Sequence, residues 1–153
     1  MTVDSIRAEL ESIDTEIRAR NHYGVRDLLD RRVQLFRDLR CAEHRFISRG
    51  ITHTLTVEPE DDGWLFELSS WALDLSVGML ADDAIALAAA LTSGTRFEVA
   101  DVMTDASVTF ELDPTRTAWA VVVRAGCDVR GARLTGGEAA ELAAIIRERH
   151  QHA

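Results

Sequence analysis

Apolar residues recur at helical spacing through the first twenty positions of the chain. They are separated by four, three and four residues, which is the period of one face of an amphipathic α-helix. Acidic residues gather early in this segment, and Arg18 and Arg20 come late, an order that suits the helix dipole. The pattern therefore predicts a helix whose buried face is formed by Ile6, Leu10, Ile13 and Ile17.

A second helical series follows an interruption at residues 21–24. We expect Gly24 to take the left-handed conformation that ends a helix, with Val25 making the hydrophobic contact after it. Two antiparallel helices in a hairpin are the preferred interpretation of residues 1–50. One continuous helix is the alternative, because no capping residue stands before Val25. The second series comprises Val25, Leu28 or Leu29, Val33, Phe36 and Leu39.

After Gly50 the period of the apolar positions changes to two, which is the period of a half-buried β-strand. A first strand is predicted from Ile51, and a turn follows at residues 59–63. Two further strands are predicted over residues 64–68 and 71–77. Asp82 and Asp83 then open an alanine-rich helix that ends near Gly94. This part of the chain therefore predicts three strands followed by one helix.

The same order of elements recurs 55 residues later. When residues 51–91 are placed on residues 106–146, the only two prolines coincide, and so do Trp64 and Trp119. These matches favour a degenerate internal repeat. The alternative is that any two units of three strands and a helix look alike at this level. A further strand is predicted between the repeats, at residues 95–103.

The second helix of the body has the clearest start signal in the chain. Thr135 precedes Glu138 by three residues, which is the spacing of a capping box. Hairpin-connected strands with one helix per unit favour an α+β fold with mostly antiparallel sheet. We therefore predict a helical hairpin over residues 1–50 and a body of two βββα repeats over residues 51–153, related by a pseudo-twofold axis.

The composition excludes several kinds of chemistry. All 17 basic residues are arginine, so Schiff bases on lysine, pyridoxal phosphate attachment and a Walker-type lysine are impossible. The 26 acidic residues give a net charge of −9. We expect no signal peptide, no apolar run of about 20 residues occurs, and the two cysteines predict no disulfide framework. We expect a cytoplasmic protein with no membrane partner.

No group of residues predicts a reaction. Cys41 and His44 lie three residues apart on a helix, but zinc would need two further ligands. His53 lies on the apolar side of its strand and is interpreted as a hydrogen-bonded histidine of the core or sheet edge. His150 and His152 are assigned to a frayed C-terminus. We expect no metal, no cofactor and no catalytic residue, and a non-enzymatic role is favoured.

The arginines of the second helix raise the possibility of nucleic-acid binding through phosphate contacts. The candidates are Arg26, Arg31, Arg32, Arg37 and Arg40. Strand-rich units that each end in a helix also resemble the single-strand-binding folds of the Pur-alpha and Whirly kind, which implies binding through basic, aromatic sheet faces. Residues 51–153 carry seven arginines against 17 acids, so they would repel phosphates. Pairing with the acids of the first helix is the alternative, and a nucleic-acid partner is disfavoured.

The function predicted from the sequence is a non-enzymatic assembly module. The helices are expected to bind a second copy of the chain or another protein. Trp71 has no tryptophan at its repeat-related position, Gly126, and is the candidate for an additional exposed contact. A small-ligand or enzyme site between the two repeats is the alternative function. The predicted partner-binding residues are Leu10, Ile13, Ile17, Leu29, Val33, Phe36 and Trp71.

Overall fold

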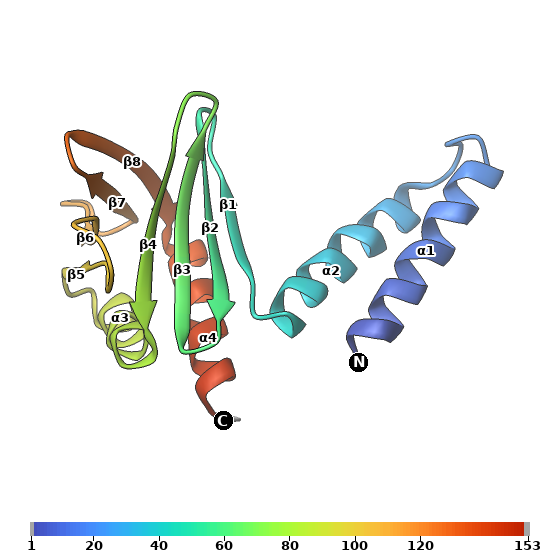
Figure 1. Cartoon of the computed structure of the whole chain (residues 1–153). Coiled ribbons are helices and arrows are strands. Elements are labelled where there is room, and N and C mark those ends of the chain that lie inside the picture. Colours follow the sequence, from blue (N-terminus) through green and yellow to red (C-terminus); the bar gives the residue numbers. More distant parts are fainter. Residues whose placement is uncertain (1, 152–153) are drawn as a thin grey trace. The chain divides into compact units, whose positions relative to one another are not determined.

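The computed structural model describes residues 2–151, except for the side chains of Arg40 and Cys41. The chain divides into two compact units (Figure 1). The first unit ends at Glu43 and is a helical hairpin; the second begins at His44 and is called the body here. The mixed α+β class predicted from the sequence is confirmed.

The hairpin consists of α1 (Val3–Ala19) and α2 (Arg26–Ala42), so the hairpin and not the single long helix is the correct alternative. Asn21, with a φ of 50°, takes the left-handed position directly after the C-cap of α1. Its amide donates to the carbonyl of Arg18 at 3.1 Å, and the next amide donates to that of Ile17 at 3.2 Å. This is a Schellman motif. The expectation that Gly24 ends the helix was wrong; Gly24, also left-handed, shapes the loop that follows.

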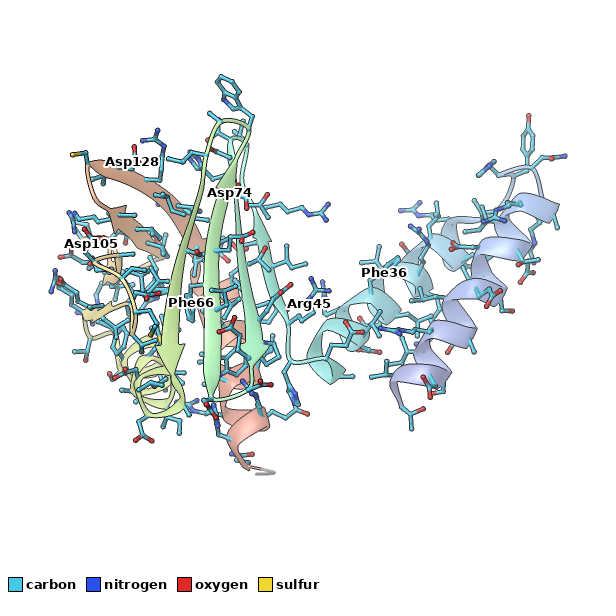
Figure 2. The ribbon with its side chains drawn as sticks, viewed as in Figure 1. Phe36, Arg45, Phe66, Asp74, Asp105 and Asp128 are labelled. Atoms are coloured by element: carbon cyan, nitrogen blue, oxygen red, sulfur yellow. The ribbon has the colours of Figure 1, made fainter. Side chains whose placement is uncertain are left out.

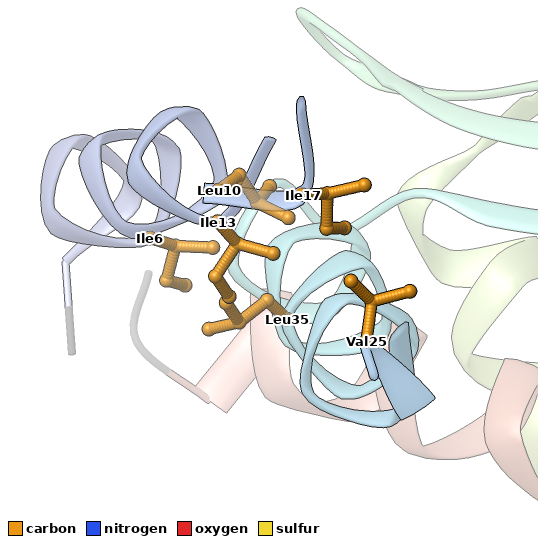
Figure 3. Close-up of a cluster of buried hydrophobic side chains, with 6 residues drawn as sticks. All are labelled: Ile6, Leu10, Ile13, Ile17, Val25 and Leu35. Carbon is orange, nitrogen blue, oxygen red and sulfur yellow. The ribbon is translucent and has the colours of Figure 1, made fainter. Parts of the chain in front are cut away.

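The hairpin has a small core of its own (Figure 3). Four side chains from α1 point toward the side chains contributed by α2 and the residue before it, so the predicted apolar face of α1 is the face that is buried. Leu28, Leu39 and Ala42 pack against this cluster and are partly buried. The fully buried members are Ile6, Leu10, Ile13, Ile17, Val25 and Leu35.

The body contains two four-stranded antiparallel sheets, each followed by one helix. In each sheet the strands are ordered as they occur in the chain. The first repeat comprises β1 (Phe46–Arg49), β2 (His53–Glu60), β3 (Gly63–Ser70), β4 (Asp74–Leu80) and α3 (Ala81–Ser93). The second comprises β5 (Phe97–Ala100), β6 (Ser107–Leu112), β7 (Ala118–Ala125), β8 (Asp128–Thr135) and α4 (Gly136–Gln151).

Each repeat therefore has four strands where the sequence predicted three. The predicted helix over residues 1–50 stops at Ala42, and β1 lies within the segment that we expected to be helical. Phe46 and Ser48 are buried, and Arg49 is exposed, which is strand-like alternation. The strand predicted between the repeats is β5, and it is the counterpart of β1 in the second repeat.

The strand registers define which residues of the two repeats are equivalent. Trp64 pairs with Met79 and Trp119 pairs with Leu134, so the third and fourth strands obey the offset of 55. In contrast, Trp64 faces Pro59 while Trp119 faces Leu112. The β2–β6 offset is therefore 112 − 59 = 53, and Pro114 lies in the turn. Pro59 and Pro114 therefore do not occupy equivalent positions in the two repeats, although the order of strands and helix is repeated.

The two sheets are separate, and their inner faces meet. The rings of Phe66 on β3 and Phe110 on β6 are arranged edge to face with centroids 5.8 Å apart (Phe66 is labelled in Figure 2). The helices α3 and α4 pack against each other. Helix α3 also contacts β3, β4 and β5, while α4 contacts β7, β8 and β1. Each helix therefore covers two strands of its own repeat and the first strand of the other.

Candidate functional site

Helix α2 carries apolar side chains on two faces. One face packs against α1, and the other exposes Leu29, Val33 and Phe36, which are 45%, 59% and 39% accessible. These three side chains, called the α2 stripe here, are spaced by four and three residues and so follow one face of the helix. Such a continuous exposed apolar series is typical of an interaction surface.

A groove of about 430 Å³ lies beside the α2 stripe, between the two helices of the hairpin. Its apolar lining is formed by Leu10, Phe36 and Leu39, and Phe36, which is labelled in Figure 2, also belongs to the stripe. Polar side chains of α1 line it as well, among them Glu11 and Arg18. Sequence reasoning did not single out these two residues, although their spacing of seven places them on one face of α1.

Ion pairs join the two helices of the hairpin, and one of their carboxylates, Asp14, also lines the groove. The Arg31 guanidinium donates to both carboxylate oxygens of Glu9, at 2.9 and 3.2 Å, and this bonding raises the pKa of Arg31. Arg32 donates to Asp14 at 2.9 Å and lies over the ring of Phe36, 4.8 Å from its centre. These contacts are the helix-to-helix pairing that we weighed against nucleic-acid binding.

Two of the five arginines considered for nucleic-acid binding are therefore held by carboxylates of α1. Arg26 and Arg37 are exposed and form no ion pair with the residues that the structure describes. The side chain of Arg40 lies outside the described residues. The positive charge available to a phosphate backbone is smaller than the sequence suggests.

The predicted partner-binding residues fall into three places. Leu10, Ile13 and Ile17 are buried in the hairpin core; Leu10 also lines the groove, whereas Ile13 and Ile17 do not. The second group is the exposed α2 stripe. Trp71 belongs to the body, where it lies in the turn between β3 and β4 and is 95% exposed.

The histidines of the body make local contacts. His53, at the start of β2, shares a hydrogen bond of 2.7 Å with the hydroxyl of Thr52. His150 lies within α4 and accepts a hydrogen bond of 2.9 Å from the indole of Trp64, so its assignment to a frayed end was wrong. Burial, followed by the nearby charge of Arg149, lowers the pKa of His150 below its ordinary value.

The described residues contain no group of three or more His, Cys, Asp or Glu side chains placed to hold a metal ion. The side chain of Cys41 lies outside that part of the chain, so the Cys41–His44 pair has no structural description. Cys127 is exposed. None of the helices in residues 2–151 combines the length and the apolar character needed to cross a membrane.

No family model, curated protein sequence or solved structure matches this chain. The functional argument therefore rests on the geometry of the hairpin and the body.

Proposed function

We propose that the protein assembles with a second copy of itself through the helical hairpin, so that two hairpins form a four-helix bundle. The observation that carries this proposal is the second apolar face of α2. A helix with apolar residues on two faces needs a neighbour on each side, and α1 covers only one of them.

The size of the hairpin supports the same conclusion. Its core contains six buried side chains in a unit of about 40 residues. Units of this size rarely bury enough apolar surface to be stable unless another chain, a metal or a disulfide contributes. Covering the α2 stripe with a second hairpin would enlarge this core and remove the exposed apolar surface from water.

The charges along the groove favour a second copy over an unrelated partner. Glu11 and Arg18 form no ion pair with any described residue, and both line the groove. Asp14 lies about halfway between Glu11 and Arg18 along α1. Asp14 is ion-paired with Arg32, and Arg32 is the neighbour in sequence of Val33, the central residue of the stripe. A twofold axis at this point would place Arg18 of one copy against Glu11 of the other.

The first prediction follows from this arrangement. Sedimentation equilibrium of the full chain should give a mass of twice 17.0 kDa. The V33E substitution should raise the dissociation constant about a hundredfold or more, because it places an unpaired charge inside the apolar contact. M103E, which changes an exposed apolar residue of the body, is the matched control and should leave the mass unchanged.

A charge exchange tests the twofold pairing separately. E11R and R18E should each weaken association, and the double variant E11R/R18E should restore it. A wild-type monomer, or a V33E variant that associates as tightly as the wild type, would contradict the proposed assembly. Failure of the double variant to recover would contradict the placement of the axis.

A further inference from the structure

A second groove lies at the junction of the two repeats and belongs entirely to the body. Its volume is about 420 Å³. It separates the β1–β2 turn of the first repeat from the edge strand β8 of the second, and we call it the junction groove. On one side it is lined by Ser48 and residues 50–53, and on the other by residues 131–133.

The repeat provides an internal comparison for this groove. The amide of Gly50 donates to the carbonyl of His53 at 2.8 Å, and the amide of Asp101 donates to that of Ala106 at 2.7 Å. These two bonds close equivalent turns, so Gly50 and Asp101 occupy equivalent positions. On the neighbouring edge strands, Gly78 pairs with Leu65 as Arg133 pairs with Ala120, which makes Gly78 and Arg133 equivalent as well.

In the second repeat, a carboxylate closes the turn onto the sheet edge. One carboxylate oxygen of Asp101 accepts a hydrogen bond from the amide of Gly78 on β4. The other oxygen accepts from the amides of Met103 and Thr104, at 2.7 and 2.9 Å. Burial alone would raise the pKa of Asp101, but these three amide bonds lower it below its ordinary value. This position therefore holds an ionised carboxylate at the edge of β4.

In the first repeat the equivalent turn residue is Gly50, which has no side chain to reach the edge of β8. The amide of Thr135, at the end of β8, donates to the Glu138 carboxylate at 3.1 Å and so points away from β7. Because the bonding direction alternates along an antiparallel strand, the amides of Arg133 and Gly131 point to the same open edge. The amide of Arg133 in the junction groove is therefore the equivalent of the Gly78 amide, which donates to the Asp101 carboxylate between β4 and the β5–β6 turn.

Two further side chains of the junction groove are more polar than their equivalents. The registers match Ser48 with Val99 and His53 with Ala106. Ser48 is 7% exposed as a residue, and its hydroxyl forms no hydrogen bond within the described part of the chain. The hydroxyl oxygen is not fully buried and lies on the groove wall, so it is available to a ligand in the groove.

Arg133 adds positive charge to the groove. Its side chain is 74% exposed and forms an ion pair with Asp113 at 3.2 Å, which a ligand carboxylate in the groove would replace. None of the residues that line the groove is acidic. The groove combines an outward amide, an unbonded hydroxyl, an imidazole and a guanidinium, which are the groups that bind a carboxylate.

We propose that the junction groove binds a carboxylate, which would take the place at the β8 edge that the Asp101 carboxylate takes at the β4 edge. The carboxylate is carried either by a small organic acid or by an acidic side chain of a peptide. This site is independent of the proposed assembly, because every residue in it belongs to the body.

The test uses the full chain and amide chemical shifts from NMR at constant ionic strength. Two probes represent the two sources of carboxylate: succinate, and the acetylated, amidated tripeptide Ala-Asp-Val, which copies residues 100–102. Their uncharged isosteres are succinamide and Ala-Asn-Val. We expect a carboxylate probe to shift the amides of Gly131 and Arg133 saturably, while its isostere does not. The probe that binds more tightly identifies the source.

Three variants locate the site. R133A should weaken binding about tenfold, whereas R124A, which removes an exposed arginine of β7 outside the groove, should not. S48V, which installs the residue of the other repeat, should weaken it severalfold. G50D should abolish binding by supplying an internal carboxylate; its Cβ would lie 3.2 Å from the His53 carbonyl oxygen, so a small backbone shift is needed.

The proposal is overturned if neither carboxylate probe gives saturable shifts at these amides. It is equally overturned if the isosteres bind as tightly as the acids, or if R124A weakens binding as much as R133A. S48V and R133A keep the test valid if G50D does not fold, because S48V installs the residue that the equivalent strand position of the other repeat holds, and R133A changes an exposed side chain.

Discussion

The two buried tryptophans, Trp64 and Trp119, occupy equivalent positions, and Trp64 has polar partners on α4. Trp64 donates its indole N–H to His150, and the guanidinium of Arg149 lies over its ring, 4.9 Å from the centre. Arg149 also donates to the carbonyls of Glu60 and Gly63, which ties α4 to the β2–β3 turn. At the offset of 55, Thr95 stands where His150 would be, so Trp119 has no equivalent imidazole. Of the two tryptophans, only Trp64 therefore donates its indole N–H to a histidine.

This contact predicts a pH dependence of stability. Because the pKa of His150 is lowered in the folded protein, folding releases protons near and below the ordinary histidine pKa of 6.5. The free energy of unfolding should be constant above about pH 7.5 and fall as the pH drops through 6.5. Urea denaturation should show this loss in the wild type and a smaller loss in H150Q, whose amide oxygen still accepts from Trp64.

The indole N–H resonance of Trp64 gives an independent measurement. It should shift with a midpoint below 6.5, while that of Trp119 stays constant over the same range. Equal pH profiles for the two indoles, or an H150Q profile identical to the wild type, would count against the contact.

Side-chain burial was predictable for the residues that follow a simple period. Trp71 is exposed, as the sequence analysis expected, and the repeat-related Trp64 and Trp119 are buried. His150 was misplaced because position near the end of the sequence gives no information on tertiary contacts. Its partner Trp64 is 86 residues away, and no local pattern connects them.

Among the elements, α4 has the best-defined start. The hydroxyl of Thr135 accepts from the Glu138 amide at 3.0 Å, and the Glu138 carboxylate accepts from the Thr135 amide at 3.1 Å. This is the reciprocal capping box that the sequence predicts. T135A should lower the free energy of unfolding by about 1 kcal/mol.

Thermal or chemical denaturation measures this change, and E138Q is the matched control. Glutamine can still accept from the Thr135 amide, so its effect should be well below that of T135A. If E138Q destabilises the protein as much as T135A, the charge of Glu138 and not the capping geometry is responsible.

The short strand β1 shows why other element boundaries were missed. The polar residue Ser48 stands at a core position and Ile47 points away from the core, so the alternation of a strand is absent from the sequence. The β6–β7 turn is two residues longer than its counterpart, which brought the prolines into false alignment. Turn length changes an alignment without leaving a hydrophobic signal.

At the scale of the whole molecule, the body holds most of the buried apolar surface. All but the six hairpin residues of the apolar core lie in residues 44–153. A chain that begins at His44 should therefore unfold cooperatively, and under the proposed assembly it should be monomeric. Calorimetry and sedimentation test this prediction, and a fragment without a cooperative transition would contradict it.

The sequence was sufficient to predict the α+β class, the hairpin and the duplication, because each has a periodic signal. It offered a site between the two repeats as an alternative but named no residue of it, and it did not predict the groove of the hairpin. The junction groove combines residues 48–53 with residues 131–133, and only the strand registers bring these segments together. Ser48 and Gly50 become informative only when the second repeat shows Val99 and Asp101 in the same places.

Each helix of the body also covers the first strand of the other repeat, and this affects how the body folds during synthesis. Strand β1 is among the first body residues to be made, yet it packs against α4, the last helix. The first repeat therefore has no complete core until residues 136–151 have left the ribosome. Contacts so distant in sequence favour slow folding. A nascent chain that stops after α3 would therefore expose to water the apolar surface of the first repeat that α4 later covers.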